Sequence, residues 1–138
     1  MDFASQVVDE AKSQEVLLPS ALFALLSPGL ILSLPSMKLN PMMMSSQSVL
    51  IHAALFGLAL WHVSSSHLGK SLSQHELLVP VILFVLLSPG LLLQVPPGSW
   101  RSGMTSLASI AVHALLFAAL YSVIRLKFPA PSPPPPSQ

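Results

Sequence analysis

The 138-residue chain contains no cysteine, and charged residues make up only 8% of it. Without cysteine the chain can form no disulfide bond, no thiolate metal site and no cysteine nucleophile. The six Lys and Arg residues form no basic cluster, which excludes a nucleic-acid partner because phosphate binding requires one. Soluble domains average about 25% charged residues, so this composition predicts that the chain lies in a lipid bilayer.

Catalytic and cofactor signatures are also lacking. The sequence shows no serine, histidine and aspartate in catalytic order, no phosphate-binding loop and no paired carboxylates within an apolar run. His62, His67 and His75 lie close together in the chain, but their irregular spacing matches no zinc motif. We therefore expect no enzymatic activity, no cofactor and no metal site.

A tandem repeat with an offset of 61 residues organises the chain. Between Pro19 and Pro35, 11 of 17 residues are identical to those of Pro80–Pro96. The same offset continues without a gap and pairs His52 with His113. Because one register covers both segments, the repeated unit is predicted to be a helical hairpin.

Each repeat contains two apolar runs that are long enough to be transmembrane helices. The first runs, residues 16–34 and 77–95, have 19 residues without a charge, whereas about 20 are needed to cross a bilayer. The second runs, residues 48–63 and 107–124, are slightly shorter and carry one deep histidine each. We therefore predict an all-α membrane protein with four transmembrane helices in two tandem hairpins.

Three segments lie outside the predicted hairpins: a polar N-terminal segment (1–15), a linker (64–76) and a Pro-rich tail (125–138). The tail is predicted to be extended or disordered, either as a solvated end or as a ligand for a polyproline-binding module. The two termini and the linker are predicted to lie on one side of the membrane, together with Lys12, Lys70, Arg125 and Lys127. The other side has Lys38 and Arg101. This excess favours cytoplasmic termini.

Both first runs contain a Ser-Pro-Gly tripeptide, at Ser27-Pro28-Gly29 and Ser88-Pro89-Gly90. Proline removes a helical N–H and disfavours helical geometry in the residue before it, so each helix should kink or break there. Ser27 and Ser88 are placed to cap a new helical turn. One interpretation is a broken helix that binds ions at mid-membrane, as in transporters. The other is a packing kink that lets a neighbouring helix approach.

His52 and His113 occupy equivalent places inside the second predicted span of each repeat. Such residues are functional candidates by default, as proton relays or ligands. No carboxylate lies in a span to complete a relay. The alternative is a neutral imidazole that forms a hydrogen bond with a serine or with a carbonyl at the break in its own hairpin. Trp61, Trp100 and Tyr121 fall near the predicted span ends, where amphipathic rings anchor helices at the membrane interface.

The second repeat resembles a plant family of very small hairpin membrane proteins that is catalogued only as a domain of unknown function. The resemblance rests on Val81–Pro97, which contains Leu-Leu-Ser-Pro-Gly-Leu and a Gln-Val-Pro exit, and on Ile110–Leu120, which contains Val-His-Ala. The first repeat departs with a Ser33-Leu34-Pro35 exit and with Lys38–Pro41 in its turn. The resemblance implies a tandem duplication of the family unit and a membrane location, and it supplies no activity.

The spaced prolines also resemble the proline knot of oleosin-like lipid-droplet proteins. The spacing is longer here, and each hairpin is interrupted by a loop with Lys38 or Arg101, so insertion from one face only is the lesser alternative. We expect a non-enzymatic scaffold or accessory subunit of the endomembrane system (ER, Golgi or plasma membrane) that packs against other membrane proteins or self-associates. The alternative is a small oligomeric transporter or channel that uses the Ser-Pro-Gly breaks and the two histidines.

Overall fold

The structure is a computed structural model that describes residues 2–28, 30, 32–33, 38–39, 46–69, 71–89 and 107–131. The elements in these residues are, in order, α1 (Phe3–Ala11), α2 (Gln14–Leu26), β1 (Leu32–Ser33), β2 (Lys38–Leu39), α3 (Ser46–His67), α4 (Gln74–Leu87) and α5 (Leu107–Lys127). The two short strands are antiparallel, with Leu32 opposite Leu39 and Ser33 opposite Lys38.

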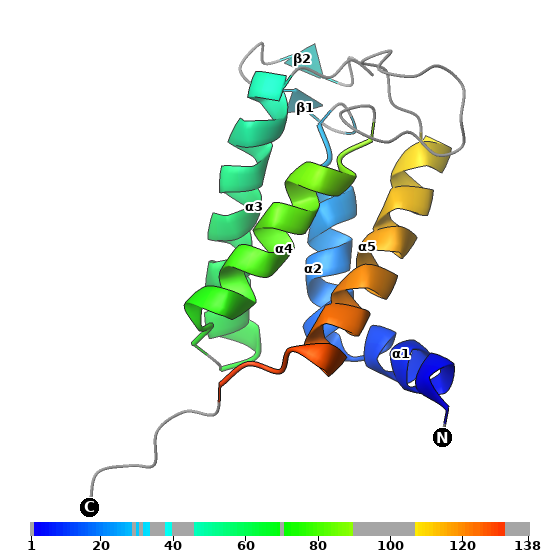
Figure 1. The fold of residues 1–138 in the computed structure, drawn as a ribbon. Helices are drawn as coiled ribbons and strands as arrows, with labels where there is room; N and C mark the ends of the chain where they lie inside the picture. Colours follow the sequence, from blue (N-terminus) through cyan, green and yellow to red (C-terminus); the bar gives the residue numbers. More distant parts are fainter. Residues whose placement is uncertain are drawn as a thin grey trace, which may run out of the picture.

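Helices α2 to α5 form an up-and-down four-helix bundle (Figure 1). Helices α2 and α4 each pack between α3 and α5, so both hairpins share one interior. Helix α1 lies across the end of the bundle and contacts α5 and α2. The α3–α4 connection and the end of α5 lie at that same end, which we call the base, and the strands lie at the opposite end. The repeated helical hairpins expected from the sequence are therefore present, with two shorter and two longer helices.

The first helix of each hairpin ends at the Ser-Pro-Gly tripeptide, so of the predicted kink or break the structure has the break, and α2 does not continue as a kinked helix to residue 34. Residues 90–95 lie outside the described residues. Helix α2 ends at Leu26 and α4 at Leu87, and Leu32–Ser33 is strand. The cause is the residue before each proline: Ser27 has φ −57° and ψ 125°, and Ser88 has φ −57° and ψ 121°. A pre-proline residue is disfavoured in helical geometry and adopts these extended values, which stop the helix.

The second helices extend beyond their predicted limits. Helix α3 continues to His67 and α5 to Lys127, so the predicted linker at 64–76 shrinks to the residues between His67 and Gln74. The polar run after Val63 stays helical, and Ser65 Oγ donates to the carbonyl of His62 at 2.9 Å. Helix α4 begins with a capping box in which Ser73 and Glu76 each bond the other's backbone N–H.

The polar N-terminal segment contains an unforeseen helix, α1. Asp2 is its N-cap and accepts a hydrogen bond from the backbone N–H of Ser5 at 2.8 Å. Hydrogen bonding to the Ser5 side chain, and next to its backbone N–H, lowers the pKa of the Asp2 carboxyl. Helix α1 is joined to α5 by the Arg125–Glu10 ion pair and by the Lys127 ammonium, which lies 5.7 Å from the centroid of the Phe3 ring.

Four phenylalanine rings, Phe23, Phe56, Phe84 and Phe117, fill the centre of the bundle and are fully buried. The Phe23 and Phe117 centroids are 5.0 Å apart and stacked, and the equivalent pair Phe84 and Phe56 is stacked at 4.9 Å. Phe23 also meets Phe84 edge-on at 5.3 Å, and Phe56 meets Phe117 edge-on at 6.1 Å. Because matched pairs have matched geometry, the sequence repeat corresponds to a pseudo-twofold axis along the bundle.

The outer surface of the bundle is also apolar. Large exposed side chains include Leu17 and Leu25 on α2, Leu55 and Leu58 on α3, Ile82 and Leu86 on α4, and Leu115 and Leu120 on α5. Within the described residues, α3 and α5 are long and apolar enough to cross a membrane, whereas α2 and α4 are shorter apolar helices. At 1.5 Å per residue, the 22 residues of α3 reach about 33 Å, close to the ~30 Å hydrocarbon core of a bilayer.

Candidate functional site

The two broken helix ends are equivalent and lie inside the bundle. Ser27 and Ser88 are each only 1% exposed. The Ser27 hydroxyl donates to the carbonyl of Phe23 at 2.8 Å, and the Ser88 hydroxyl donates to the carbonyl of Phe84 at 2.7 Å. Each serine hydroxyl therefore completes the last turn of the helix before it. The cap of a following turn, which the sequence predicted, would involve residues that lie largely outside the described part of the chain. Gly29 and Gly90 lie outside the described residues.

Both predicted intramembrane histidines close these helix ends. His52 Nδ1 lies 2.7 Å from the carbonyl oxygen of Leu26, and His113 Nδ1 lies 2.5 Å from that of Leu87. A carbonyl oxygen only accepts, so Nδ1 carries the proton in both rings. The acceptor is thus a carbonyl at the break in the same hairpin. The sequence had predicted either this carbonyl or a serine as the partner of a neutral imidazole. His52 is 4% exposed and His113 is fully buried.

The serine and histidine of each break provide hydrogen-bond donors for the end of the helix. The last carbonyls of a helix have no intrahelical donor, and leaving one of them buried without a partner costs about 1–3 kcal/mol. Serine and histidine supply two donors to each end, and the histidine comes from the partner helix of the hairpin. The unit of serine, proline, terminal carbonyl and histidine is called the helix-end cap below. No group of three ligating side chains suited to a metal lies among the residues that the structure describes.

The predicted interface anchors have different environments. Trp61 is 55% exposed on α3, and Trp100 lies outside the described residues. Tyr121 is only 4% exposed and packs at 5.8 Å against Phe117, so its ring faces the interior of the bundle and not the outer surface. The prediction placed Tyr121 by its nearness to the end of an apolar run. Its position on α5 instead turns the ring into the bundle.

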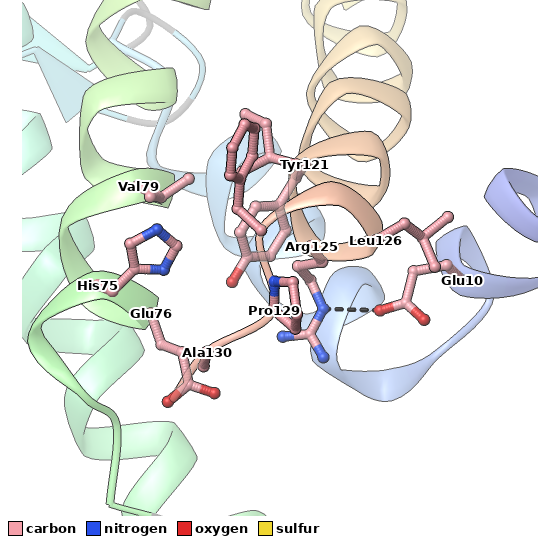
Figure 2. A pocket seen from close by; sticks show the side chains of 11 residues that line it. Glu10, His75, Glu76, Val79, Tyr121, Arg125, Leu126, Pro129 and Ala130 are labelled. Atoms are coloured by element: carbon pink, nitrogen blue, oxygen red, sulfur yellow. Dashed lines mark hydrogen bonds and ion pairs between the residues drawn. The ribbon is translucent and has the colours of Figure 1, made fainter. Parts of the chain in front are cut away.

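An ionic cluster at the base was not predicted from the sequence. Arg125 Nε donates to Glu10 at 2.6 Å, and its Nη2 donates to Glu15, so one guanidinium joins α5 to α1 and α2. Tyr121 and Glu76 lie beside this cluster around a cavity of about 300 Å³ (Figure 2). The repeat itself contained a signal: the position equivalent to Arg125 in the first repeat is Ser64, so the second repeat alone has a charge there.

Two hairpins with equivalent helix-end caps around one axis define an internally duplicated four-helix bundle. The sequence comparisons agree with this class. Residues 11–64 and 75–130 both match the family described as "Protein of unknown function (DUF3339)", and the chain belongs to that family. The two matched segments correspond to the two hairpins. No curated protein and no solved structure matches the chain.

Proposed function

We propose that this protein is a membrane-embedded, non-enzymatic scaffold or accessory subunit whose four helices pack against other membrane proteins or further copies of the chain. The observation that carries the proposal is the apolar outer surface. Only 39% of the most apolar window of α3 and 33% of that of α5 is buried inside the bundle. The core helix of a soluble protein is mostly buried, whereas these two helices expose most of their apolar length.

The helix-end caps also suit a lipid environment. Helix α2 has 13 residues and α4 has 14, so each reaches about 20 Å, less than the ~30 Å hydrocarbon core. Each break would therefore lie within the bilayer. Non-helical backbone is tolerated there only when protein or a water-filled cavity surrounds it. The buried Ser27, Pro28, Ser88 and Pro89 and their hydrogen bonds meet that requirement.

The phenylalanine quartet separates this proposal from the transporter alternative. Its four stacked and edge-on rings occupy the axis between the helix-end caps and the ionic cluster at the base. A solute path through one chain would have to displace all four rings. A transporter of this kind would need its path between copies of the chain, and no observation specifically favours that assembly.

The same proposal places the protein in the endomembrane system with its base, and thus both termini, in the cytoplasm. Support comes from the larger number of Lys and Arg residues at that end. The test is extraction of isolated membranes with alkaline carbonate, followed by affinity purification in mild detergent. The protein is expected to stay in the membrane pellet and to purify with a partner protein or a second copy. Release into the supernatant, or recovery as a lone monomer, would contradict the proposal.

A further inference from the structure

Helix α1 has one apolar side and one polar side. The apolar positions recur at the spacing of a helical face, and they are Phe3, Ala4, Val7, Val8 and Ala11. The polar positions between them are Ser5, Gln6, Asp9 and Glu10. A helix with this pattern has one side suited to water and one side suited to an apolar surface.

The bundle covers only one edge of this apolar face. Val7 and Ala11 are half-buried, whereas Phe3 is 48% exposed and Val8 is 51% exposed. None of the nine residues of α1 is buried. The apolar face is therefore wider than the contact that α1 makes with the bundle, and its uncovered part is available to a second apolar surface.

Two contacts with α5 fix the direction in which the uncovered part points. Glu10 accepts from Arg125 Nε at 2.6 Å, and the Lys127 ammonium lies 5.7 Å from the centroid of the Phe3 ring. Phe3 and Glu10 are seven residues apart and so lie on one line along the helix, which is held against α5. Val8 is turned about 140° around the helix axis from Phe3, because it follows five residues later at 3.6 residues per turn. Val8 thus lies on the far side of the apolar face from α5.

The position of α1 selects a lipid surface as the partner. Helix α1 lies across the base and not along the bundle (Figure 1). In the proposed membrane location the bundle crosses the bilayer, so α1 lies in the plane of the membrane at the level where α5 ends. The apolar outer surface reaches this level: Leu17 near the start of α2 is 51% exposed, and Phe128 directly after α5 is 64% exposed. The uncovered face of α1 therefore extends the surface that is proposed to meet lipid.

The charged groups of α1 have partners within the protein. Glu10 is paired with Arg125, and the Asp9 carboxylate lies 3.8 Å from the Lys12 ammonium. Asp2 accepts the hydrogen bond of the helix N-cap. Binding of such a helix to a membrane depends on its apolar area and on attraction between charges. Because these carboxylates are engaged within the chain, the apolar area is the main contribution, and a bilayer of neutral lipid is sufficient.

We propose that α1 is an interfacial helix that inserts Phe3, Ala4 and Val8 into the headgroup region of the bilayer around the base. The inference rests on the proposed membrane location and adds a second kind of lipid contact to it. Arg125 joins α1 to α5 and, through Glu15, to α2. A helix held at the membrane surface through Arg125 would fix the depth at which the base of the bundle lies.

The test measures the depth of single sites in the full chain, reconstituted in phosphatidylcholine nanodiscs. The chain contains no cysteine, so one introduced cysteine carries the fluorescent probe. Val8→Cys reports the apolar face of α1, and Gln6→Cys, exposed on its polar side, is the matched control. Leu115→Cys, 72% exposed on α5, reports whether the bundle itself lies in lipid. Leu115 is about 18 Å along α5 from Lys127, well away from the base.

Quenching by nitroxide-labelled lipid and by aqueous iodide distinguishes the outcomes. The Val8 probe is expected to be quenched several-fold more by the lipid, and several-fold less by iodide, than the Gln6 probe. A nitroxide near the headgroup should act most on Val8 and a nitroxide deep in the acyl chain most on Leu115, since interfacial helices lie about 5–10 Å into the headgroup boundary.

The contrary outcomes separate this inference from the proposed membrane location. Equal iodide quenching at Val8 and Gln6, with Leu115 quenched by lipid, overturns the interfacial helix and leaves the membrane location in place. A Val8 probe that neither quencher reaches would mean that a protein surface covers this face, which also overturns the inference. Iodide quenching at Leu115 would contradict the membrane location, and the interfacial helix with it.

Discussion

His113 donates from Nδ1 to the carbonyl oxygen of Leu87 at 2.5 Å, and its duplicate His52 does the same to Leu26 at 2.7 Å. Donor and acceptor are 26 residues apart in both repeats. Both repeats have both members of the pair, because either member alone would be a buried polar group without a hydrogen-bond partner. A helix that ends in apolar surroundings needs a donor for its last carbonyls, and a deep histidine needs an acceptor.

Removal of either histidine should destabilise the fold. His52→Ala or His113→Ala leaves a buried carbonyl without its donor, so each is expected to lower the free energy of unfolding by about 1–3 kcal/mol. Thermal unfolding in detergent measures the loss. His62→Ala, on the exposed face of α3, is the matched control and should change little. A double His52→Ala, His113→Ala variant with unaltered stability would refute the helix-end cap.

The pseudo-twofold axis predicts equal costs at equivalent positions. Phe23→Ala and Phe84→Ala should each destabilise the bundle by about 3–5 kcal/mol, because both rings are fully buried in the quartet. Chemical denaturation of the two variants in the same detergent measures this. Phe3→Ala, at a ring that is 48% exposed on α1, should cost far less. Clearly unequal losses at Phe23 and Phe84 would mean that the two hairpins do not share one symmetric core.

Arg125→Gln should release α1 from the bundle while the bundle stays folded. The guanidinium ties α1 through Glu10 and α2 through Glu15, and α1 has no buried residues of its own. Hydrogen exchange at the amides of α1 is expected to become faster, with little change in α3. Lys12→Gln serves as the control, because the Lys12–Asp9 pair is exposed and such pairs contribute little. Unchanged protection of α1 in Arg125→Gln would show that Arg125 does not hold α1 against the bundle.

Proline is the predicted cause of helix termination. In Pro28→Ala, Ser27 is no longer held in extended geometry, and α2 is expected to continue past Leu26. The carbonyl of Leu26 would then accept an intrahelical bond and the cap with His52 would weaken. Hydrogen exchange resolved by residue would show new protected amides after Ser27. If the protected region still ended at Leu26, packing around the break and not proline would be the cause.

The repeat, the helical hairpins and the histidine and serine of each cap could be predicted from the sequence. Whether the histidine bonds a serine or a carbonyl at the break could not. His52 and Ser27 were identified because polar residues are conspicuous in apolar runs. The sequence left a kink and a break at Ser27-Pro28 equally open, because the pre-proline effect weakens helical geometry without deciding whether the helix resumes. Resumption depends on tertiary contacts, and here Leu32–Ser33 pairs as a strand with Lys38–Leu39.

Other features required the three-dimensional arrangement. Phe23 and Phe117 lie 94 residues apart in the 138-residue chain, and only the closed bundle brings their rings to 5.0 Å. The burial of Tyr121 follows from its direction on α5, which an apolar run without a polar face does not reveal. The pairing of Arg125 with Glu10 depends on α1, a short helix in a segment whose composition is merely polar.

The most direct test of the central proposal, that the bundle lies in a bilayer with its base at one face, is cysteine accessibility. The chain contains no cysteine, so single substitutions can be labelled without background. Ser66→Cys and Ser71→Cys lie at the base, and Ser46→Cys begins α3 at the opposite end. In sealed vesicles, a membrane-impermeant maleimide should label the two base positions from the cytoplasmic face, Ser46→Cys from the other face, and Leu58→Cys in mid-helix from neither. Labelling of all four positions from one face would contradict the account.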